Sequence, residues 1–317
     1  MEKVFLTERI HSDAVSYLQE HFEVVQGAST NPADVIRQAK GCAAILIRSA
    51  KITAEVMDAI PTLRVVAKHG MGVDNIDVDH ATEKGILVVN APFSNLNAVA
   101  EHIVMLLLSL SKRTVRMDKL TRQGEFAKRN EYKTMELKGA TVGIVGMGKI
   151  SRLVVKKLAG FEMKILASDP FVTQEDMAGF PVTMVPPEEV YRRSDVVIVH
   201  TSLFPSTYHL VGAEQFRMMK KTAYIINAAR GPVIDEAAMI AALRNGEIAG
   251  AGLDVFEQEP PEKENPLFAM DNVILSPHNA ALSEGALRAM AMDSALGITE
   301  YLTGKTVTYP VNGEVLK

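Results

Sequence analysis

The chain has 317 residues, of which 47% are hydrophobic and 23% are charged. This composition is typical of an ordinary globular protein and excludes disordered and fibrous classes, and the length is sufficient for two domains with separate cores. The net charge of −4 gives no basic footprint for nucleic acid, so we expect no nucleic-acid partner.

No stretch of the sequence indicates export or membrane insertion. The first ten residues lack the long apolar region of a signal peptide. The longest apolar candidate, residues 98–110, carries Glu101 and His102 and is shorter than the roughly 18 residues that a membrane helix needs. The single cysteine, Cys42, cannot form a disulfide within the chain, and a small buried hydrophobic residue is a more common role for it than a catalytic thiol. We expect a cytoplasmic protein with no membrane partner and no metal site.

Apolar runs typical of strands alternate with helical patterns in the first third of the chain. Strands are predicted at residues 4–6, 43–47, 64–67 and 86–89, and helices at residues 13–21, 32–38 and 78–84. Strands separated by helices of this length indicate βαβ units and a parallel sheet.

A second series of strands follows a long helix. We predict this helix from Asn97 to about Leu120, because the segment lacks Pro and Gly and is apolar at helical spacing. Further strands are predicted at residues 141–145, 164–167, 196–200, 223–226, 250–253 and 273–275. Six strands are enough for a full dinucleotide-binding sheet.

The last predicted helix covers residues 284–302, and an extended tail follows at about residues 309–316. A chain that ends in this way is expected to return to its first α/β unit. The fold class is therefore predicted to be α/β, with two Rossmann-like, doubly wound parallel-sheet domains and a cleft between them. Residues 1–96 and 284–317 would form the first domain, and residues 97–283 the second.

A glycine-rich turn directly follows the predicted strand at residues 141–145. Its sequence fits G-x-G-x-x-G from Gly146 and Gly148, except that Ser151 replaces the third glycine. The first glycine permits the tight turn and the second lets the backbone approach a pyrophosphate, while a small serine still allows close packing of helix on strand. The turn predicts a dinucleotide site.

Asp169 ends the next predicted strand, 21 residues after Gly148. A carboxylate at this spacing accepts hydrogen bonds from the adenosine ribose and repels a 2′-phosphate. The alternative role for Asp169 is a turn former before Pro170. The spacing predicts NAD rather than NADP as the cofactor.

Three residues suit the chemistry of hydride transfer. Arg230 follows a predicted strand and can hold a carboxylate in bidentate fashion. His278, also after a strand, can pass a proton to a carbonyl, and Glu259 can hydrogen-bond its imidazole. Taken singly, a surface ion pair is the more common role of Arg230 or Glu259, and His278 could cap a helix.

Several motifs occur together in this chain. They are Gly146-Met147-Gly148-Lys149-Ile150, Asn227-Ala228-Ala229-Arg230-Gly231, Leu253-Asp254-Val255-Phe256 with Glu259-Pro260, and Ser276-Pro277-His278. Together they resemble the D-isomer-specific 2-hydroxyacid dehydrogenases, and the resemblance covers nearly the whole chain. The spacings of 29 residues from Arg230 to Glu259 and 19 from Glu259 to His278 also suit this family.

The resemblance implies that Arg230 binds the substrate carboxylate, that His278 is the acid–base and that Glu259 supports it. It implies a flavodoxin-like substrate-binding first domain, an NAD-binding Rossmann second domain, and a homodimer joined through the second domain and the long helix. The implied cofactor contacts are Gly146, Gly148, Lys149, Ile150, Asp169, His200, Thr201, Ala228 and Asp254, the last near the nicotinamide carboxamide. Ser151 departs from the family pattern, as does Ser202, which stands where many members have proline.

In the first domain, Lys68-His69-Gly70-Met71-Gly72 resembles the family's substrate loop, whose backbone N–H groups meet the substrate carboxylate. Asn95 resembles the entry to the interdomain helix, and an N-cap is its alternative role. The implied substrate-binding residues are Arg48, Ser49, Lys68, Met71, Gly72 and Asn95.

Arg48-Ser49-Ala50 resembles the phosphoglycerate dehydrogenase branch, where the equivalent arginine reaches the substrate phosphate. Lys68 would supply a second cation, which makes 3-phosphoglycerate one candidate substrate. In the other interpretation, Arg48 and Lys68 only shape the site for glyoxylate, hydroxypyruvate or another short 2-keto acid. Because the sequence ends at Lys317, we expect no C-terminal serine-sensing domain and no feedback control of that type.

We therefore predict an NAD-dependent oxidoreductase acting on a small 2-hydroxy or 2-keto acid. A different class is a dinucleotide-binding corepressor, since some relatives of this fold regulate transcription; cofactor binding without turnover would favour it. A formate dehydrogenase would need a glutamine beside the histidine, and Glu259 argues against it.

Overall fold

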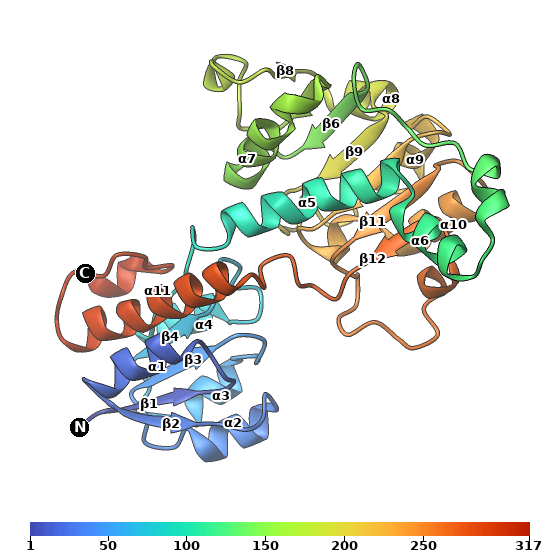
Figure 1. Cartoon of the computed structure of the whole chain (residues 1–317). Helices are drawn as coiled ribbons and strands as arrows, with labels where there is room; N and C mark the ends of the chain where they lie inside the picture. Colours follow the sequence, from blue (N-terminus) through green and yellow to red (C-terminus); the bar gives the residue numbers. More distant parts are fainter. The chain divides into compact units, whose positions relative to one another are not determined.

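The computed structural model describes all 317 residues and divides into two compact units. Unit 1 comprises Met1–Asn95 and Ala281–Lys317, and unit 2 comprises Leu96–Ala280. Each unit is a parallel sheet with helices packed around it (Figure 1). The predicted α/β class with two parallel-sheet domains is confirmed.

Unit 1 is built on a five-stranded sheet with the order β2-β1-β3-β4-β5, which is the flavodoxin-like order. The strands are β1 (Lys3–Leu6), β2 (Glu23–Gln26), β3 (Ala44–Ile47), β4 (Val65–Lys68) and β5 (Leu87–Val89). Every residue of β3 is buried, as expected of a central strand covered on both faces. β2 was not predicted, because this edge strand has polar residues at both ends and only two valines between them.

Five helices accompany this sheet. They are α1 (Ser12–Gln19), α2 (Pro32–Gln38), α3 (Ala54–Asp58), α4 (Val78–Glu83) and α11 (Glu284–Leu302). The red helix α11 lies along α1 and β4 (Figure 1), so the chain returns to its first unit as predicted. Its close approach to β5 depends on Gly297, because a Cβ there would lie 3.0 Å from the Val89 side chain.

The predicted extended tail is wrong in its last residues, which form a 3₁₀ helix at Gly313–Leu316. The tail first pairs with β5 through a bridge between Pro310 and Val89. The buried Asn312 then accepts a hydrogen bond from Val88 N at 2.7 Å and donates one to Ile86 O at 3.0 Å. The Asn312 side chain thereby satisfies the edge of the sheet at β5 in place of a backbone strand, and the residues after it form the 3₁₀ helix.

Unit 2 has a seven-stranded parallel sheet with the order β12-β11-β10-β9-β6-β7-β8. Its strands are β6 (Thr141–Val145), β7 (Lys164–Ser168), β8 (Thr183–Met184), β9 (Val196–Val199), β10 (Tyr224–Asn227), β11 (Gly250–Leu253) and β12 (Val273–Leu275). The order is that of a dinucleotide-binding Rossmann sheet with one more edge strand. All strands are parallel, but β6 to β8 are added towards one edge of the sheet and β9 to β12 towards the other, so the strand order reverses between β6 and β9. The two-residue β8 was too short to predict.

The helices of unit 2 cover both faces of this sheet. They are α5 (Leu96–Ser111), α6 (Thr114–Arg122), α7 (Lys149–Leu158), α8 (Pro187–Arg193), α9 (Ala213–Met218) and α10 (Glu236–Arg244). α5 packs on α7 and on β11, where a Cβ at Gly252 would lie only 3.1 Å from the Leu110 side chain. The absence of a side chain at Gly252 therefore lets this apolar helix lie close to the sheet.

The single helix predicted from Asn97 to about Leu120 is wrong, because the chain breaks it at Arg113. This residue has a left-handed backbone with φ of 52°. Met135 N donates to Ser111 O at 2.8 Å, and Arg113 Nε donates to Lys133 O at 2.9 Å. A returning segment thus satisfies the helix end, and α6 starts in a new direction.

Cys42 is a free cysteine and is buried, with 1% of its surface exposed. None of the helices combines the length and the apolar composition that crossing a bilayer requires.

Candidate active site

Three neighbouring strands of unit 2 bring the candidate catalytic residues to one edge of the sheet. β10 pairs with β11 and β11 with β12, all in parallel. Arg230 follows β10, Asp254 follows β11 and His278 follows β12. Because the carboxyl ends of parallel strands share one edge, residues separated by tens of positions in sequence meet there.

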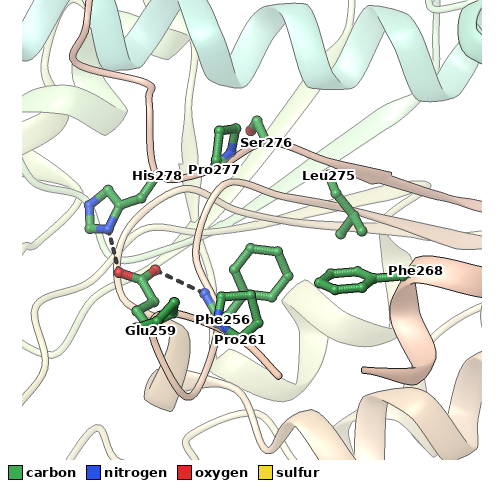
Figure 2. Close-up of a pocket in the computed structure, with 9 residues that line it drawn as sticks. Phe256, Glu259, Pro261, Phe268, Leu275, Ser276, Pro277 and His278 are labelled. Atoms are coloured by element: carbon green, nitrogen blue, oxygen red, sulfur yellow. Dashed lines mark hydrogen bonds and ion pairs between the residues drawn. The ribbon is translucent and has the colours of Figure 1, made fainter. Parts of the chain in front are cut away.

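His278 and Glu259 form a direct pair. His278 Nδ1 lies 2.7 Å from Glu259 Oε2, and Glu259 Oε1 accepts a hydrogen bond from Phe256 N at 3.1 Å, as the dashed lines in Figure 2 show. Burial raises the pKa of Glu259, but the hydrogen bond and charge of His278, the Phe256 N–H and the Arg230 charge outweigh it, so the pKa lies below its usual value. An ionised Glu259 fixes the Nδ1–H tautomer and leaves Nε2 for proton exchange.

The backbone at His278 is left-handed, with φ of 50°, a conformation that costs a non-glycine residue about 1–3 kcal/mol. Asp254 holds this loop. Its backbone oxygen accepts His278 N at 2.7 Å, and its carboxylate accepts the Ser276 hydroxyl at 2.6 Å and the backbone N–H groups of Asn279 and Ala280 at 2.9 Å. Asp254 is buried, and its expected place near the nicotinamide carboxamide stays a prediction.

A partly buried histidine extends this network to α5. His102 Nε2 lies 2.9 Å from the Ser276 hydroxyl and 3.4 Å from Asp254 Oδ1. His102 is one of the two polar residues that argued against a membrane helix, and its contact with the catalytic loop was not predicted.

Arg230 lies in a tight turn braced by the buried Asn227. The Asn227 side chain donates to Arg230 O at 2.9 Å and accepts from Ala229 N at 3.0 Å. The next residue, Gly231, touches the loop after β11, because a Cβ there would lie 1.8 Å from Phe256 O. The loop with Arg230 and the loop with Glu259 are therefore in backbone contact.

The glycine turn follows β6, next to the point where the strand order of the sheet reverses between β6 and β9. Gly146 has φ of +92°, and a Cβ there would lie 2.5 Å from His200 O, so only glycine fits between the ends of β6 and β9. A Cβ at Gly148 would meet no atom within 4 Å. The turn thus keeps open space beside Gly148 at the start of α7, as close approach of a pyrophosphate requires.

Two polar side chains brace this turn. Ser151, in the position of the third glycine, donates through its hydroxyl to Gly146 O at 2.7 Å. Asp169 Oδ2 accepts Met147 N at 2.7 Å and Oδ1 accepts Phe171 N at 2.8 Å. Asp169 therefore has the turn-forming role given as its alternative, beside whatever contact it makes to a ribose.

His200 supplies a buried polar atom without a partner. Its Nδ1 has no hydrogen bond, and burial, reinforced by the Arg230 charge, lowers the pKa of His200 to about 4. The ring is therefore neutral near pH 7. An orphaned buried nitrogen calls for an unseen partner, and together with the open space at Gly148 it shows that these residues fit a dinucleotide.

Two candidate substrate residues of unit 1, Arg48 and Ser49, follow β3 and bind Glu8, and a third, Lys68, ends β4. Arg48 N and Ser49 N donate to Glu8 Oε2 at 2.9 and 3.0 Å, and the Ser49 hydroxyl donates to Oε1 at 2.6 Å. Lys68 Nζ donates to Arg48 O and, at 2.8 Å, to Asn75 Oδ1. The structure brings Arg48, Ser49 and Lys68 together; Glu8 and Asn75 were missed, since only the fold places them here.

The glycine loop of unit 1 is also tied down. Gly70 has φ of +140°, and Asn90 Nδ2 donates to Met71 O at 2.7 Å. Asn95 directly precedes α5, but its Oδ1 is buried without a hydrogen-bond partner. The N-cap interpretation of Asn95 is therefore wrong.

His69, a buried residue of the same loop, should make the stability of unit 1 depend on pH. Burial, with the Arg48 and Lys68 charges, lowers the pKa of His69 to about 4 from 6.5. Between pH 4 and pH 6.5 the unfolded chain binds a proton at His69 more readily than the folded chain does. The contribution of neutral His69 to the free energy of unfolding is therefore complete above pH 6.5 and is lost as pH falls towards 4. Between pH 7 and pH 5 the loss should be about 2 kcal/mol.

Urea unfolding at both pH values tests this prediction in the wild type, in His69→Gln and in the control His21→Gln, an exposed histidine of the same unit. In His69→Gln the free energy of unfolding should fall less between pH 7 and pH 5 than in the wild type, and in His21→Gln it should fall as much as in the wild type. The same pH dependence in His69→Gln and wild type would contradict the assignment.

A pocket of about 440 Å³ borders the His278–Glu259 pair (Figure 2). It is lined by Phe256, Glu259, Pro260, Pro261, Phe268, Leu275, Ser276, Pro277 and His278. The Phe256 and Phe268 rings meet edge to face, with centroids 6.1 Å apart. The sequence did not predict this pocket, because its apolar residues come from three separate segments.

Comparison with known proteins supports the family resemblance. The model of the family described as D-isomer specific 2-hydroxyacid dehydrogenase, NAD binding domain, matches residues 104–280. The chain is 39% identical to D-3-phosphoglycerate dehydrogenase of Methanocaldococcus jannaschii, over 98% of this chain but only 60% of the relative. It is 41% identical to glyoxylate reductase of Thermofilum pendens, over 99% of this chain and 96% of the relative.

Solved structures agree. The TT0316 protein from Thermus thermophilus superposes with a TM-score of 0.89 at 30% identity, over 98% of this chain and 99% of that one. An NADPH-dependent glyoxylate/hydroxypyruvate reductase from Sinorhizobium meliloti gives 0.87 at 30% identity, over 98% of each chain. The predicted family is confirmed: the chain belongs to the D-isomer specific 2-hydroxyacid dehydrogenases, a family with an NAD-binding domain.

Proposed function

We propose that the protein is an NAD-dependent D-2-hydroxyacid dehydrogenase, which transfers hydride between nicotinamide and C2 of a 2-keto or 2-hydroxy acid. The observation that carries this proposal is the 2.7 Å contact of His278 Nδ1 with the Glu259 carboxylate at the carboxyl edge of a Rossmann sheet. Arg230 lies on the adjoining loop, and its charge lowers the pKa of both Glu259 and His200.

Each of these three residues has one task in the reduction of a keto acid. The Arg230 guanidinium binds the carboxylate through charge-assisted hydrogen bonds and thereby orients the carbonyl. The reduced nicotinamide, when bound, supplies the hydride. His278 gives its Nε2 proton to the C2 oxygen, while Glu259 holds the ring and stabilises the imidazolium before transfer. Oxidation of the hydroxy acid is the same path reversed.

For the cofactor, we infer that Gly146, Gly148, Lys149 and Ile150 hold the pyrophosphate through the start of α7. Asp169 would bind the ribose hydroxyls, Asp254 would lie near the nicotinamide carboxamide, and Thr201, Ala228 and the orphaned Nδ1 of His200 would complete the site. The supporting observations are the open space at Gly148 and the place of Asp169 at the end of β7.

Cofactor choice offers a test of Asp169. Asp169→Asn removes the negative charge that repels a 2′-phosphate but keeps an oxygen for Met147 N. The ratio of kcat/KM with NADPH to that with NADH should rise about tenfold, equivalent to about 1.4 kcal/mol. Asp176→Asn, an exposed aspartate of the same unit, is the control. An unchanged ratio in Asp169→Asn would contradict the ribose contact.

Two substrate assignments follow from different observations. Arg48 and Lys68 lie together in unit 1, and this favours the phosphate of 3-phosphoglycerate. The full-length match to glyoxylate reductases favours glyoxylate or hydroxypyruvate, whereas the chain spans only about 60% of the phosphoglycerate dehydrogenases it matches. We propose that unit 1 binds the substrate through Arg48, Ser49, Lys68, Met71, Gly72 and Asn95.

The experiment that tests the function is a substrate panel. Oxidation of NADH and NADPH would be followed with glyoxylate, hydroxypyruvate, phosphohydroxypyruvate and pyruvate. Turnover with at least one acid is expected, and the ranking separates the two assignments. Cofactor binding without turnover of any acid would favour the corepressor class instead.

We also propose that the protein is cytoplasmic and forms a homodimer. Sedimentation equilibrium can test the dimer.

A further inference from the structure

Two glutamates outside the catalytic set join the loops that carry it. Glu236 is the first residue of α10, shortly after Arg230, and Glu257 lies two residues before Glu259. Glu236 N donates to Glu257 Oε2 at 3.0 Å, and Glu257 N donates to Glu236 Oε2 at 3.1 Å. This reciprocal pair, which we call the carboxylate clamp, fixes the backbone of each loop with the side chain of the other.

The second oxygen of each carboxylate also has a partner. Asn265 Nδ2 donates to Glu236 Oε1 at 2.7 Å, and His209 Nε2 lies 2.8 Å from Glu257 Oε1. His209 has a left-handed backbone with φ of 50° and also lies 4.0 Å from Asp235. Two carboxylates placed side by side would repel each other, and these four donor groups offset that repulsion. Because every oxygen of the two carboxylates has a partner, we expect the carboxylate clamp to adopt one defined geometry.

The clamp sits where the two loops touch. A Cβ at Gly231 would lie 1.8 Å from Phe256 O and 2.6 Å from Glu257 N, so the residue after Arg230 is in contact with the clamped segment. The N–H of Phe256 in turn binds Glu259 Oε1 at 3.1 Å. A displacement of Glu257 therefore changes both the orientation of Glu259 and its spacing from Arg230.

We propose that Glu236, through its reciprocal hydrogen bonds with Glu257, is a positioning residue for the Glu259–His278 pair. It acts through the backbone of the loop after β11, to which its carboxylate is bonded. This inference rests on the proposed function, because the positioned pair is the acid–base of that reaction.

Substitutions of Glu236 separate side-chain length from charge. Glu236→Asp keeps the charge and suits the first turn of a helix, but its carboxylate is one methylene too short to reach Glu257 N. Glu236→Gln loses the charge and keeps an oxygen for Glu257 N, while its amide nitrogen takes the place of the acceptor of Asn265 Nδ2. Glu214→Ala is the matched control, since Glu214 is an exposed glutamate in the first turn of α9 in the same unit.

Steady-state kinetics with the best acid of the panel should separate the variants. Glu236→Asp is expected to lower kcat at least tenfold with a smaller change in KM. Glu236→Gln should retain kcat within about threefold, as should Glu214→Ala. The urea midpoint of Glu236→Asp should stay close to that of the wild type, so that the loss is not one of folded protein.

A second readout needs no turnover. In protein labelled with ¹⁵N-histidine, the rate at which the His278 Nδ1 proton exchanges with water reports on its bond to Glu259. Its exchange should be at least fivefold faster in Glu236→Asp and unchanged in Glu214→Ala. Unchanged kcat and unchanged exchange in Glu236→Asp would overturn the proposal, as would a loss of activity that only follows a loss of folded protein. Faster exchange in Glu236→Asp, combined with a wild-type protein that turns over no acid, would instead overturn the proposed function alone.

Discussion

His278→Asn should lower kcat about 10³-fold, because positioned acid–base groups contribute about 10²–10⁴ to the rate. Asparagine tolerates the left-handed backbone that His278 adopts with φ of 50°, so the loop should keep its shape. It cannot carry a proton to the C2 oxygen, and Glu259 loses the hydrogen bond that lowers its pKa. Steady-state assays at pH 7 with saturating NADH and keto acid measure the effect.

The control for this variant is His21→Asn, an exposed histidine in unit 1. It should leave kcat unchanged, and both variants should show the urea midpoint of the wild type within a small margin. A folded His278→Asn enzyme with kcat within a few-fold of the wild type would show that another group moves the proton.

Arg230→Ala should act mainly on substrate binding. Truncating one partner of a charge-assisted pair costs about 2–5 kcal/mol, so KM for the keto acid should rise at least 30-fold, since 1.4 kcal/mol is about tenfold. Arg230→Lys should recover only part of this loss, because an ammonium group cannot make the bidentate contact. The KM values of both variants, measured across the substrate panel, test the prediction.

Arg129→Ala is a suitable control, because Arg129 is an exposed arginine of unit 2. The dissociation constant for NADH, from fluorescence titration, should be little changed in Arg230→Ala. If KM were unchanged and NADH binding weakened, Arg230 would belong to the cofactor site rather than to the substrate site.

The sequence was sufficient to predict elements whose local pattern agrees with the fold. α2, α11, β6, β11 and β12 have the bounds predicted for them, because each is a continuous apolar or amphipathic run that ends at turn residues. The meeting of Arg230, Glu259 and His278 was predictable as well. Each follows a strand of one parallel sheet, and such strands end at a common edge.

The break at Arg113 could not be predicted from local pattern. Residues 97–120 are uniformly compatible with a helix, and the break depends on the returning segment that contains Lys133 and Met135. Tertiary hydrogen bonds override helix propensity here. Tertiary hydrogen bonds also explain why the short strands β2 and β8 were not predicted. Each forms by pairing with a neighbouring strand, β2 with β1 and β8 with β7.

The residues that support the site were the part most difficult to predict. Asp254 was expected near the nicotinamide, and the bonds of its carboxylate to the His278 loop were not predicted. Glu8 and Glu236 looked like ordinary surface glutamates in the sequence, and each accepts backbone N–H groups from a loop distant along the chain. Backbone hydrogen bonds of this kind leave no residue pattern at fixed spacing, so only the folded chain shows them.

The central claim is that hydride moves from the nicotinamide to C2 of a 2-keto acid and that the product has the D configuration. The most direct measurement is turnover of hydroxypyruvate and phosphohydroxypyruvate with NADH that carries deuterium at both C4 positions, followed by mass spectrometry and chiral chromatography of the product. We predict one deuterium at C2 of a D-glycerate or its phosphate. Product without deuterium at C2, or of the L configuration, would contradict the account.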